Sequence, residues 1–203
     1  MSLVSVATLK EYLTEIGANT GSDTELQNML NRVEAVVAEF LGFPKPSSST
    51  TTAQLSQTTY TLYFDAPTDS DRTVLQLNVK PINSVASVHS DVLRVYGSDT
   101  ALTLSNIEID SINGRLIIKP SKPDTFYRGF RANKVVCNAG FASAPPALEH
   151  AICVLCSHLQ RAKQSQGKET MALAGISVNL SSRVIPEEAK QVLWQFRMPR
   201  SIL

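Results

Sequence analysis

Residues 135–152 read VVCNAGFASAPPALEHAI, and the spacing of the apolar residues changes within this stretch. Val135 to Asn138 have the composition of a β-strand that ends at Gly140. The Pro145-Pro146 pair then suits the first turn of a helix. Apolar residues recur after it at helical spacing: Leu148, Ala151, Ile152, Leu155, Leu159 and Ala162. The stretch therefore predicts where a β region ends and a helical region begins.

Two further helices are predicted before the β region. The first starts with the capping box Thr8-Leu-Lys-Glu11 and stops at Gly17. The second follows a capping box at residues 22–25 and carries one apolar stripe until Gly42 and Pro44 end it. We expect this second helix to be part of the core.

The region between the helices alternates apolar and polar residues, which predicts an antiparallel β module over 59–138. Residues 46–58 are rich in serine and threonine and predict a linker. Asn113-Gly114 is a strong hairpin signal. Strands are expected at residues 59–64, 75–79, 85–88, 92–96, 107–109, 116–118 and 135–138.

The last helix is predicted to begin at Pro186 and is apolar on two faces. One stripe consists of Ala189, Val192, Leu193 and Phe196, while Trp194 and Met198 lie on the far side. A terminal helix can pack on its own domain with only one of these faces. We therefore expect the Trp194/Met198 face to contact another polypeptide.

The predicted fold class is α+β, with a small helical core of about four helices and an inserted antiparallel β module. Residues 1–45 and 139–203 are assigned to the helical core. Residues 169–184 predict a loop that holds a short strand at Ile176 to Leu180.

Composition narrows the functional classes. The 203 residues are 43% hydrophobic with a net charge of +1, and they contain neither an 18-residue apolar run nor a signal peptide, which predicts a cytoplasmic protein. Three cysteines are too few for a disulfide framework. Residues 1–45 hold six acidic and three basic residues, whereas residues 115–203 hold five acidic and thirteen basic ones.

Catalytic and metal-binding patterns are weak. His150, Cys153, Cys156 and His158 have poor geometry for a zinc site, because the two histidines point in different directions on one helix. No Gly-x-Ser-x-Gly elbow and no phosphate-binding loop occurs in the sequence. The acidic loop at 65–71 does not match a calcium site. We expect no enzymatic activity, no metal and no cofactor.

A basic run could serve as an interaction surface. It comprises Arg115, Lys119, Lys122, Arg128, Arg131 and Lys134, with Phe126, Tyr127 and Phe130 interleaved. Basic residues with aromatics suit a nucleic-acid surface, and they suit a rim that contacts an acidic neighbour equally well. Lys122, Arg128, Arg131 and Lys134 are the candidates for either contact.

Three stretches resemble the head-tail connector proteins of tailed bacteriophages, also called adaptor or head-completion proteins. The first is Thr8-Leu-Lys-Glu-Tyr-Leu13 followed by residues 23–42, which end in Phe40-Leu41-Gly42. The second is the pattern of Leu75, Leu77, Pro81, Ser84, Val85 and Val88. The third is Asn138-Ala-Gly140-Phe141 followed by Pro145, Leu148 and Ala151-Ile152.

The resemblance implies a structural protein that forms a ring, usually twelve-fold, beneath the portal vertex. It would extend the DNA channel and offer a platform for a stopper or tail-completion protein, with packaged DNA passing through without specific contacts. The protein would be found in the virion, and in the host cytoplasm during assembly. A chain that is monomeric by itself would join the ring when a portal supplies many contacts at once.

The same resemblance makes the segment from Pro186 to Leu203 the part that docks on the portal. The residues expected there are Val192, Trp194, Phe196, Arg197, Met198 and Arg200. The loop that carries Ile176, Val178 and Leu180 would reach a neighbouring subunit or the next protein toward the tail. Deletion of 186–203 is expected to leave a folded monomer that no longer binds its portal.

Three alternatives stay open from the sequence. The chain could be a neck protein one layer further toward the tail, or a non-specific nucleic-acid-binding module that uses residues 115–134. A metal-dependent enzyme around Cys153 and Cys156 is the third.

Overall fold

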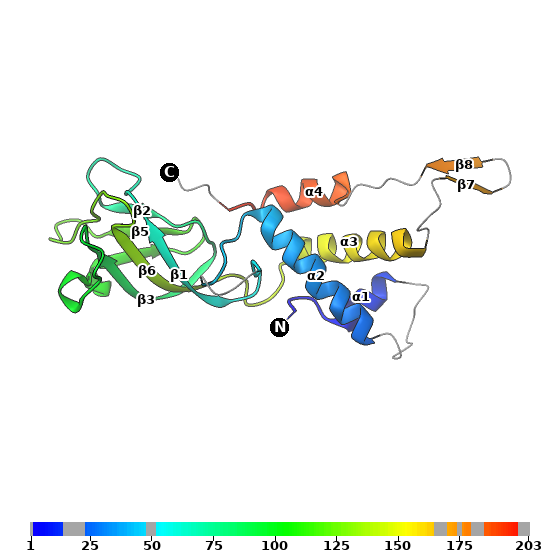
Figure 1. Ribbon diagram of the computed structural model, residues 1–203, viewed down its shortest axis with the longest axis horizontal. Coiled ribbons are helices and arrows are strands. Elements are labelled where there is room, and N and C mark those ends of the chain that lie inside the picture. Colours follow the sequence, from blue (N-terminus) through cyan, green and yellow to red (C-terminus); the bar gives the residue numbers. More distant parts are fainter. Residues whose placement is uncertain are drawn as a thin grey trace. The chain divides into compact units, whose positions relative to one another are not determined.

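A computed structural model describes residues 2–13, 23–47, 52–164, 170–173, 176–179 and 185–198. This part of the chain forms four α-helices and eight β-strands, which confirms the predicted α+β class (Figure 1). The chain divides into two compact units, each described here by itself. The helical unit consists of Met1–Val37 and Ala144–Phe196, and the β unit begins at Ala38, runs to Ser143 and also includes Arg197 and Met198.

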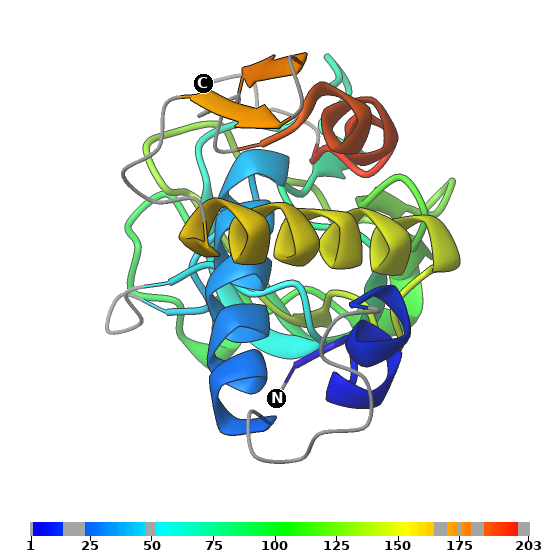
Figure 2. The ribbon, with the colours of Figure 1, turned by 90° about the vertical axis from the view of Figure 1, so that its right-hand side faces the viewer.

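The four helices follow the apolar periodicity of the sequence. Their bounds are α1 Val6–Tyr12, α2 Asp23–Leu41, α3 Pro146–Gln164 and α4 Glu187–Trp194. The last turn of α2, which begins at Ala38, belongs to the β unit. Figure 2 shows α3 crossing α2 within the helical unit. Each helix contributes side chains with no more than 2% exposure to the core: Leu9, Leu30, Leu148, Ile152 and Leu193.

The N-terminal segment is fixed to α2 by a buried carboxylate. Glu34 is 8% exposed, and its Oε1 accepts hydrogen bonds from the hydroxyl of Ser2 at 2.6 Å and from the backbone N–H groups of Leu3 and Val4 at 2.8 and 3.1 Å. Val4 is 1% exposed. Because buried backbone donors need acceptors, this single carboxylate orders the chain before α1.

Two local expectations in the helical unit were wrong. The N-cap of α1 is Ser5, whose hydroxyl accepts the N–H of Thr8 at 3.0 Å, so Thr8 lies inside the helix. Residues 169–184 were expected to be a loop with one short strand at Ile176 to Leu180. β8 Ile176–Asn179 matches that strand, but a second strand, β7 Thr170–Leu173, pairs antiparallel with it. A partner strand can form there because antiparallel strands need only a short connection.

The β unit contains two three-stranded antiparallel sheets. The first has the order β1-β6-β3, with β1 Thr58–Phe64, β6 Asn133–Ala139 and β3 Ile82–Ser90. Strand β6 is therefore central, and its alternate residues from Asn133 to Ala139 are buried, as the sequence alternation predicts. The second sheet has the order β2-β5-β4, with β2 Val74–Gln76, β5 Arg115–Ile118 and β4 Ile107–Asp110.

The hairpin predicted at Asn113-Gly114 is present. Ile107 pairs with Ile118 and Ile109 with Leu116. Gly114 has φ +70°, and its N–H donates to the carbonyl of Asp110 at 2.9 Å. The turn needs glycine because L-residues with a side chain rarely adopt this conformation.

The strand predicted at 92–96 is absent, because β3 ends at Ser90 and the chain turns at once. The carboxylate of Asp91 accepts the N–H groups of Leu93 and Val95 at 2.7 Å each, and that of Tyr96 at 2.9 Å. These donors are therefore used locally and not in a sheet. Two short 3₁₀ turns follow, η2 Ser98–Thr100 and η3 Leu104–Asn106.

Candidate functional site

Helix α4 combines a buried stripe with an exposed tryptophan. Ala189 and Leu193 are 3% and 0% exposed, whereas Trp194 is 54% exposed. Val192 and Phe196 are half-buried. The helix begins after Pro186, with two glutamates in its first turn at the positive end of the helix dipole. The structure thus presents Trp194 on the side of α4 that does not enter the core.

Met198 does not share that exposed face, so the predicted Trp194/Met198 surface is corrected. Helix α4 ends at Trp194, and the side chain of Met198 is 6% exposed. The N–H of Met198 donates to the carbonyl of Leu41 at 2.8 Å, at the end of α2. Gly42 follows at φ +83° with the hydrogen bonds of a Schellman cap.

This packing bears on the proposed deletion of residues 186–203. The deletion would remove the buried side chains of Leu193 and Met198 and the hydrogen-bond donor to Leu41. Large losses of buried apolar surface destabilise the folded state. A point substitution at Trp194 is therefore the cleaner test of C-terminal docking.

The other C-terminal candidates are placed only in part. Arg197 is half-buried. Ile176 and Val178 lie in β8, for which only the backbone is described. Leu180 and Arg200 lie outside the described residues.

The basic run divides between the core and the surface. Phe126 is 0% exposed and belongs to the core, whereas Tyr127 and Phe130 are 41% and 67% exposed. Lys122 is exposed in the turn that follows β5. Arg128 is exposed, and its Nη2 donates to the carbonyl of Asp69 at 3.2 Å.

Arg131 and Lys134 are brought together by two tyrosines. The Arg131 guanidinium carbon lies 4.2 Å from the ring centroid of Tyr63, and Lys134 Nζ lies 5.3 Å from that of Tyr96. The two rings are themselves 5.7 Å apart. Such cation–π contacts hold the positive groups in place.

Residues 91–96 were missed as a surface because they read as a strand. The loop exposes three aliphatic side chains, Val92 at 55%, Leu93 at 81% and Val95 at 76%. The Arg94 guanidinium carbon lies 5.8 Å from the ring centroid of Phe130. We name loops 91–96 and 127–131 together the cationic tip. The one local signal of the turn at 91–96 was Asp91, which stands before an apolar run.

Asp91 holds the tip, and its protonation should loosen it. Hydrogen bonds from the backbone N–H of Tyr96, and then of Leu93 and Val95, hold the pKa of Asp91 below its usual range despite opposing desolvation. Because the pKa of Asp91 is lower in the folded than in the unfolded protein, its carboxylate stabilises the folded state above about pH 4. This contribution is lost as the pH falls through the folded-state pKa.

We expect the substitution Asp91→Asn to lower the melting temperature at neutral pH and to flatten its fall below about pH 4. Thermal unfolding of both proteins across this pH range measures the difference. Asp99→Asn, at an exposed position in η2, is the matched control. Identical pH profiles for wild type and Asp91→Asn would contradict the assignment.

The thiols are poor candidates for chemistry. Cys137, Cys153 and Cys156 are buried, and burial raises their pKa values to about 11, 12 and 12. His150 Nδ1 lies 3.3 Å from the hydroxyl of Tyr12. Among the described residues, no three His, Cys, Asp or Glu side chains form a metal-binding group.

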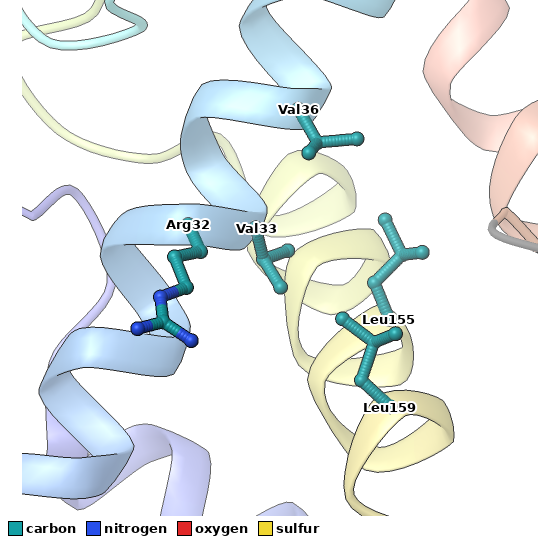
Figure 3. A pocket seen from close by; sticks show the side chains of 5 residues that line it. All are labelled: Arg32, Val33, Val36, Leu155 and Leu159. Atoms are coloured by element: carbon teal, nitrogen blue, oxygen red, sulfur yellow. The ribbon is translucent and has the colours of Figure 1, made fainter. Parts of the chain in front are cut away.

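The helical unit has a shallow apolar groove between α2 and α3. Figure 3 shows its lining: Arg32, Val33, Val36, Leu155 and Leu159. Its volume of about 60 Å³ is well below the ~300 Å³ of a small-molecule site. Within the described part of the chain, no helix is long and apolar enough to cross a bilayer.

Several solved structures and one family model are similar to this chain. A chain in the structure described as "Virion of native gene transfer agent (GTA) particle" has a TM-score of 0.56 and 16% identity, and the match covers 98% of this chain and 92% of that one. A chain in "Neck of empty GTA particle computed with C6 symmetry" has a TM-score of 0.54 and 15% identity, with coverages of 100% and 96%. A chain in "Neck of native GTA particle computed with C12 symmetry" has a TM-score of 0.52 and 13% identity, with the same coverages of 100% and 96%. At these identities the likeness shows a shared fold.

No curated protein matches the sequence. The family model described as "HCP: Head completion protein" matches residues 2–199, which is nearly the whole chain. This chain therefore belongs to the head completion protein family.

Proposed function

We propose that this chain is a structural protein of the phage neck, a head-tail adaptor that assembles into a ring beneath the portal vertex. Membership of the head completion family supports this role, and so do similar folds in necks with sixfold and twelvefold symmetry. The ring would extend the DNA channel and offer a platform to a stopper or tail-completion protein. Its mechanism is burial of surface on assembly, which requires no catalytic group.

The portal is the partner we assign to helix α4. The observation that carries this assignment is Trp194, which is 54% exposed while its neighbour Leu193 is 0% exposed. Tryptophan is enriched among the residues that dominate binding energy at protein interfaces. Val192, Phe196 and Arg197 lie beside it in the sequence and would complete the contact. The β7–β8 hairpin would face a neighbouring subunit or the next neck protein.

Replacement of Trp194 with alanine should weaken binding to portal-bearing capsids about thirtyfold, which corresponds to ~2 kcal/mol. The physical reason is the loss of a large aromatic side chain from the contact. Co-sedimentation of the purified chain with portal-bearing capsids, over a concentration series, measures the affinity. Gln191→Ala is the matched control, because Gln191 is also exposed on α4.

Unchanged capsid binding by Trp194→Ala would remove α4 as the docking element. Binding that requires another neck protein already on the capsid would place the chain one layer toward the tail. Circular dichroism checks that both variants are folded.

A non-specific contact with DNA is a second candidate, favoured by the arginines of the cationic tip. DNA affinity that falls steeply with salt, and that is lost on charge reversal of Arg128 and Arg131, would support it. Undetectable binding at low salt would exclude it.

A further inference from the structure

The turn between β4 and β5 contains an asparagine that is followed by a glycine, Asn113-Gly114. Asparagine is a thermolabile residue, because the backbone nitrogen of the next residue can attack its side-chain amide. Glycine hinders this attack least, since it has no side chain. The pair occurs once in the 203 residues, and Asn113 is exposed. The geometry of the turn therefore decides whether this asparagine survives.

Deamidation at this pair proceeds through a cyclic imide. The backbone nitrogen of Gly114 bonds to Cγ of Asn113, and the side-chain nitrogen of Asn113 leaves as ammonia with the proton that Gly114 gives up. Water then opens the imide at either carbonyl, which leaves aspartate or isoaspartate at position 113. The side-chain amide must turn toward Gly114 for this reaction, and the N–H of Gly114 must lose its proton.

Asp110 engages both of the groups that would react. Its Oδ2 accepts a hydrogen bond from Asn113 Nδ2 at 2.8 Å, and its Oδ1 accepts the backbone N–H of Asn113 at 3.1 Å. The backbone carbonyl of Asp110 accepts the N–H of Gly114 at 2.9 Å. The amide that must turn and the N–H that must ionise are thus both bound to one residue.

The charge of the Asp110 carboxylate opposes the reaction as well. Attack by Gly114 places negative charge on the side-chain oxygen of Asn113, close to the carboxylate that binds the same amide, and like charges at short range repel. Hydrogen bonds from Asn113 and the nearby charge of Arg115 hold the pKa of Asp110 below its usual range, despite opposing desolvation. The carboxylate is therefore ionised at neutral pH.

Strand β2 also holds the turn in place. Gln76 Nε2 donates to the carbonyls of Asn113 and Gly114 at 2.9 and 3.0 Å. The N–H of Leu77 donates to the carbonyl of Gly114 at 2.8 Å. A Cβ atom at Gly114 would lie 2.7 Å from the carbonyl oxygen of Val79, so the backbone has little room to move. The peptide group that would close the imide is thus fixed by a neighbouring strand.

We propose that Asn113 is a site of spontaneous deamidation and that Asp110 suppresses the reaction in the folded chain. Loss of this protection would damage the hairpin. The aspartate product places a second carboxylate beside that of Asp110, and the isoaspartate product lengthens the backbone of a tight turn by a methylene group. The proposal concerns the chemical lifetime of the β unit, and it does not depend on the neck role proposed above.

Mass spectrometry of the peptide that contains Asn113 measures the reaction, after incubation of the full chain in mildly alkaline buffer. Chromatography separates the aspartate and isoaspartate products. Asp110→Ala should raise the rate about tenfold, because it removes the carboxylate with its charge and its hydrogen bonds from Asn113. Glu108→Ala is the matched control and should keep the wild-type rate, because Glu108 is an exposed carboxylate on the same strand.

A second control separates the carboxylate from the stability of the hairpin. Ile107 is a 6% exposed residue of β4, so Ile107→Ala weakens the hairpin without removing Asp110. Thermal unfolding shows which variants are folded at the incubation temperature. Acceleration by Ile107→Ala as large as that by Asp110→Ala would overturn the role of Asp110, and so would a wild-type rate for Asp110→Ala.

The unfolded chain tests the protection as a whole. In concentrated urea the hydrogen bonds of the turn are lost, so wild type should deamidate at Asn113 faster than it does when folded. Equal rates for the folded and the urea-unfolded wild-type chain would overturn the proposal. The assay contains neither capsid nor DNA, so its outcome is independent of whether Trp194 docks on a portal.

Discussion

Replacement of Gly140 with alanine is expected to destabilise the β unit by about 3 kcal/mol. Gly140 has φ +104°, a conformation that residues with a side chain rarely adopt. A Cβ atom there would lie 2.8 Å from the carbonyl oxygen of Ser56 and 2.9 Å from that of Leu55. Both obstacles are backbone, so the chain around them must move.

The position cannot shift easily because Gly140 is bonded on both sides. Its N–H donates to the carbonyl of Pro81 at 2.9 Å, and its carbonyl accepts Asn83 Nδ2 at 2.9 Å. The next residue, Phe141, donates to the carbonyl of Leu55 at 2.9 Å. The substitution would therefore disturb three segments of the β unit together.

Denaturant unfolding, followed by the near-ultraviolet circular dichroism of the tyrosines, measures the effect. Gly97→Ala is the control, because Gly97 has φ −67° and an added Cβ would meet only the side chain of Asp99, which can rotate away. The control should stay within about 0.5 kcal/mol of wild type. Equal stability of the Gly140→Ala and Gly97→Ala proteins would contradict the steric argument.

Replacement of Glu34 with alanine should destabilise the helical unit by about 3 kcal/mol. The carboxylate is 8% exposed and accepts three hydrogen bonds from Ser2, Leu3 and Val4. Its removal leaves these donors without their acceptor in a site that is partly closed to water. The N-terminal segment that α2 holds in place should then separate from the helix.

The chain offers its own probe for this experiment, because its single tryptophan, Trp194, lies in the helical unit. Urea unfolding followed by tryptophan fluorescence gives the free energy of unfolding. Glu34→Gln keeps one acceptor oxygen and should be less destabilising than alanine. Glu39→Ala, at an exposed position on the same helix, is the control. A Glu34→Ala protein as stable as the control would show that the three bonds contribute little.

Local chemistry made the regular elements predictable from the sequence. The Asn113-Gly114 turn, the glycine that ends α2 and the proline pair before α3 each act within a few residues of themselves. Apolar periodicity then identified the helices and central strands, because one face of each must be buried. Errors occurred where two nearby residues could play the same local role. At the start of α1 both Ser5 and Thr8 are possible N-cap residues, and Ser5 is the N-cap in the structure.

The candidate surfaces were predictable only in part. Trp194 was identified because a two-faced terminal helix is unusual, but Met198 was placed beside it by extending the helix past its actual end. The basic run was visible, yet Phe126 in its middle is part of the core. Arg94 and its aliphatic neighbours were missed, because an apolar run after a strand reads as another strand.

The sequence by itself determined the α+β class and most of the regular elements, because these depend on periodicity, caps and turns that act over short distances. The resemblance of three stretches indicated the family. Only the tertiary structure decided which apolar residues stay exposed and which polar ones are buried. The aliphatic side chains of 91–96 remain outside because Asp91 captures the N–H groups that a strand would have used. Glu34 binds three donors that lie thirty or more residues before it, and Met198, near the other end of the chain from α2, is buried where its N–H binds the carbonyl of Leu41. The burial of Met198 and Glu34 is a property of such long-range contacts, and no local pattern encodes it.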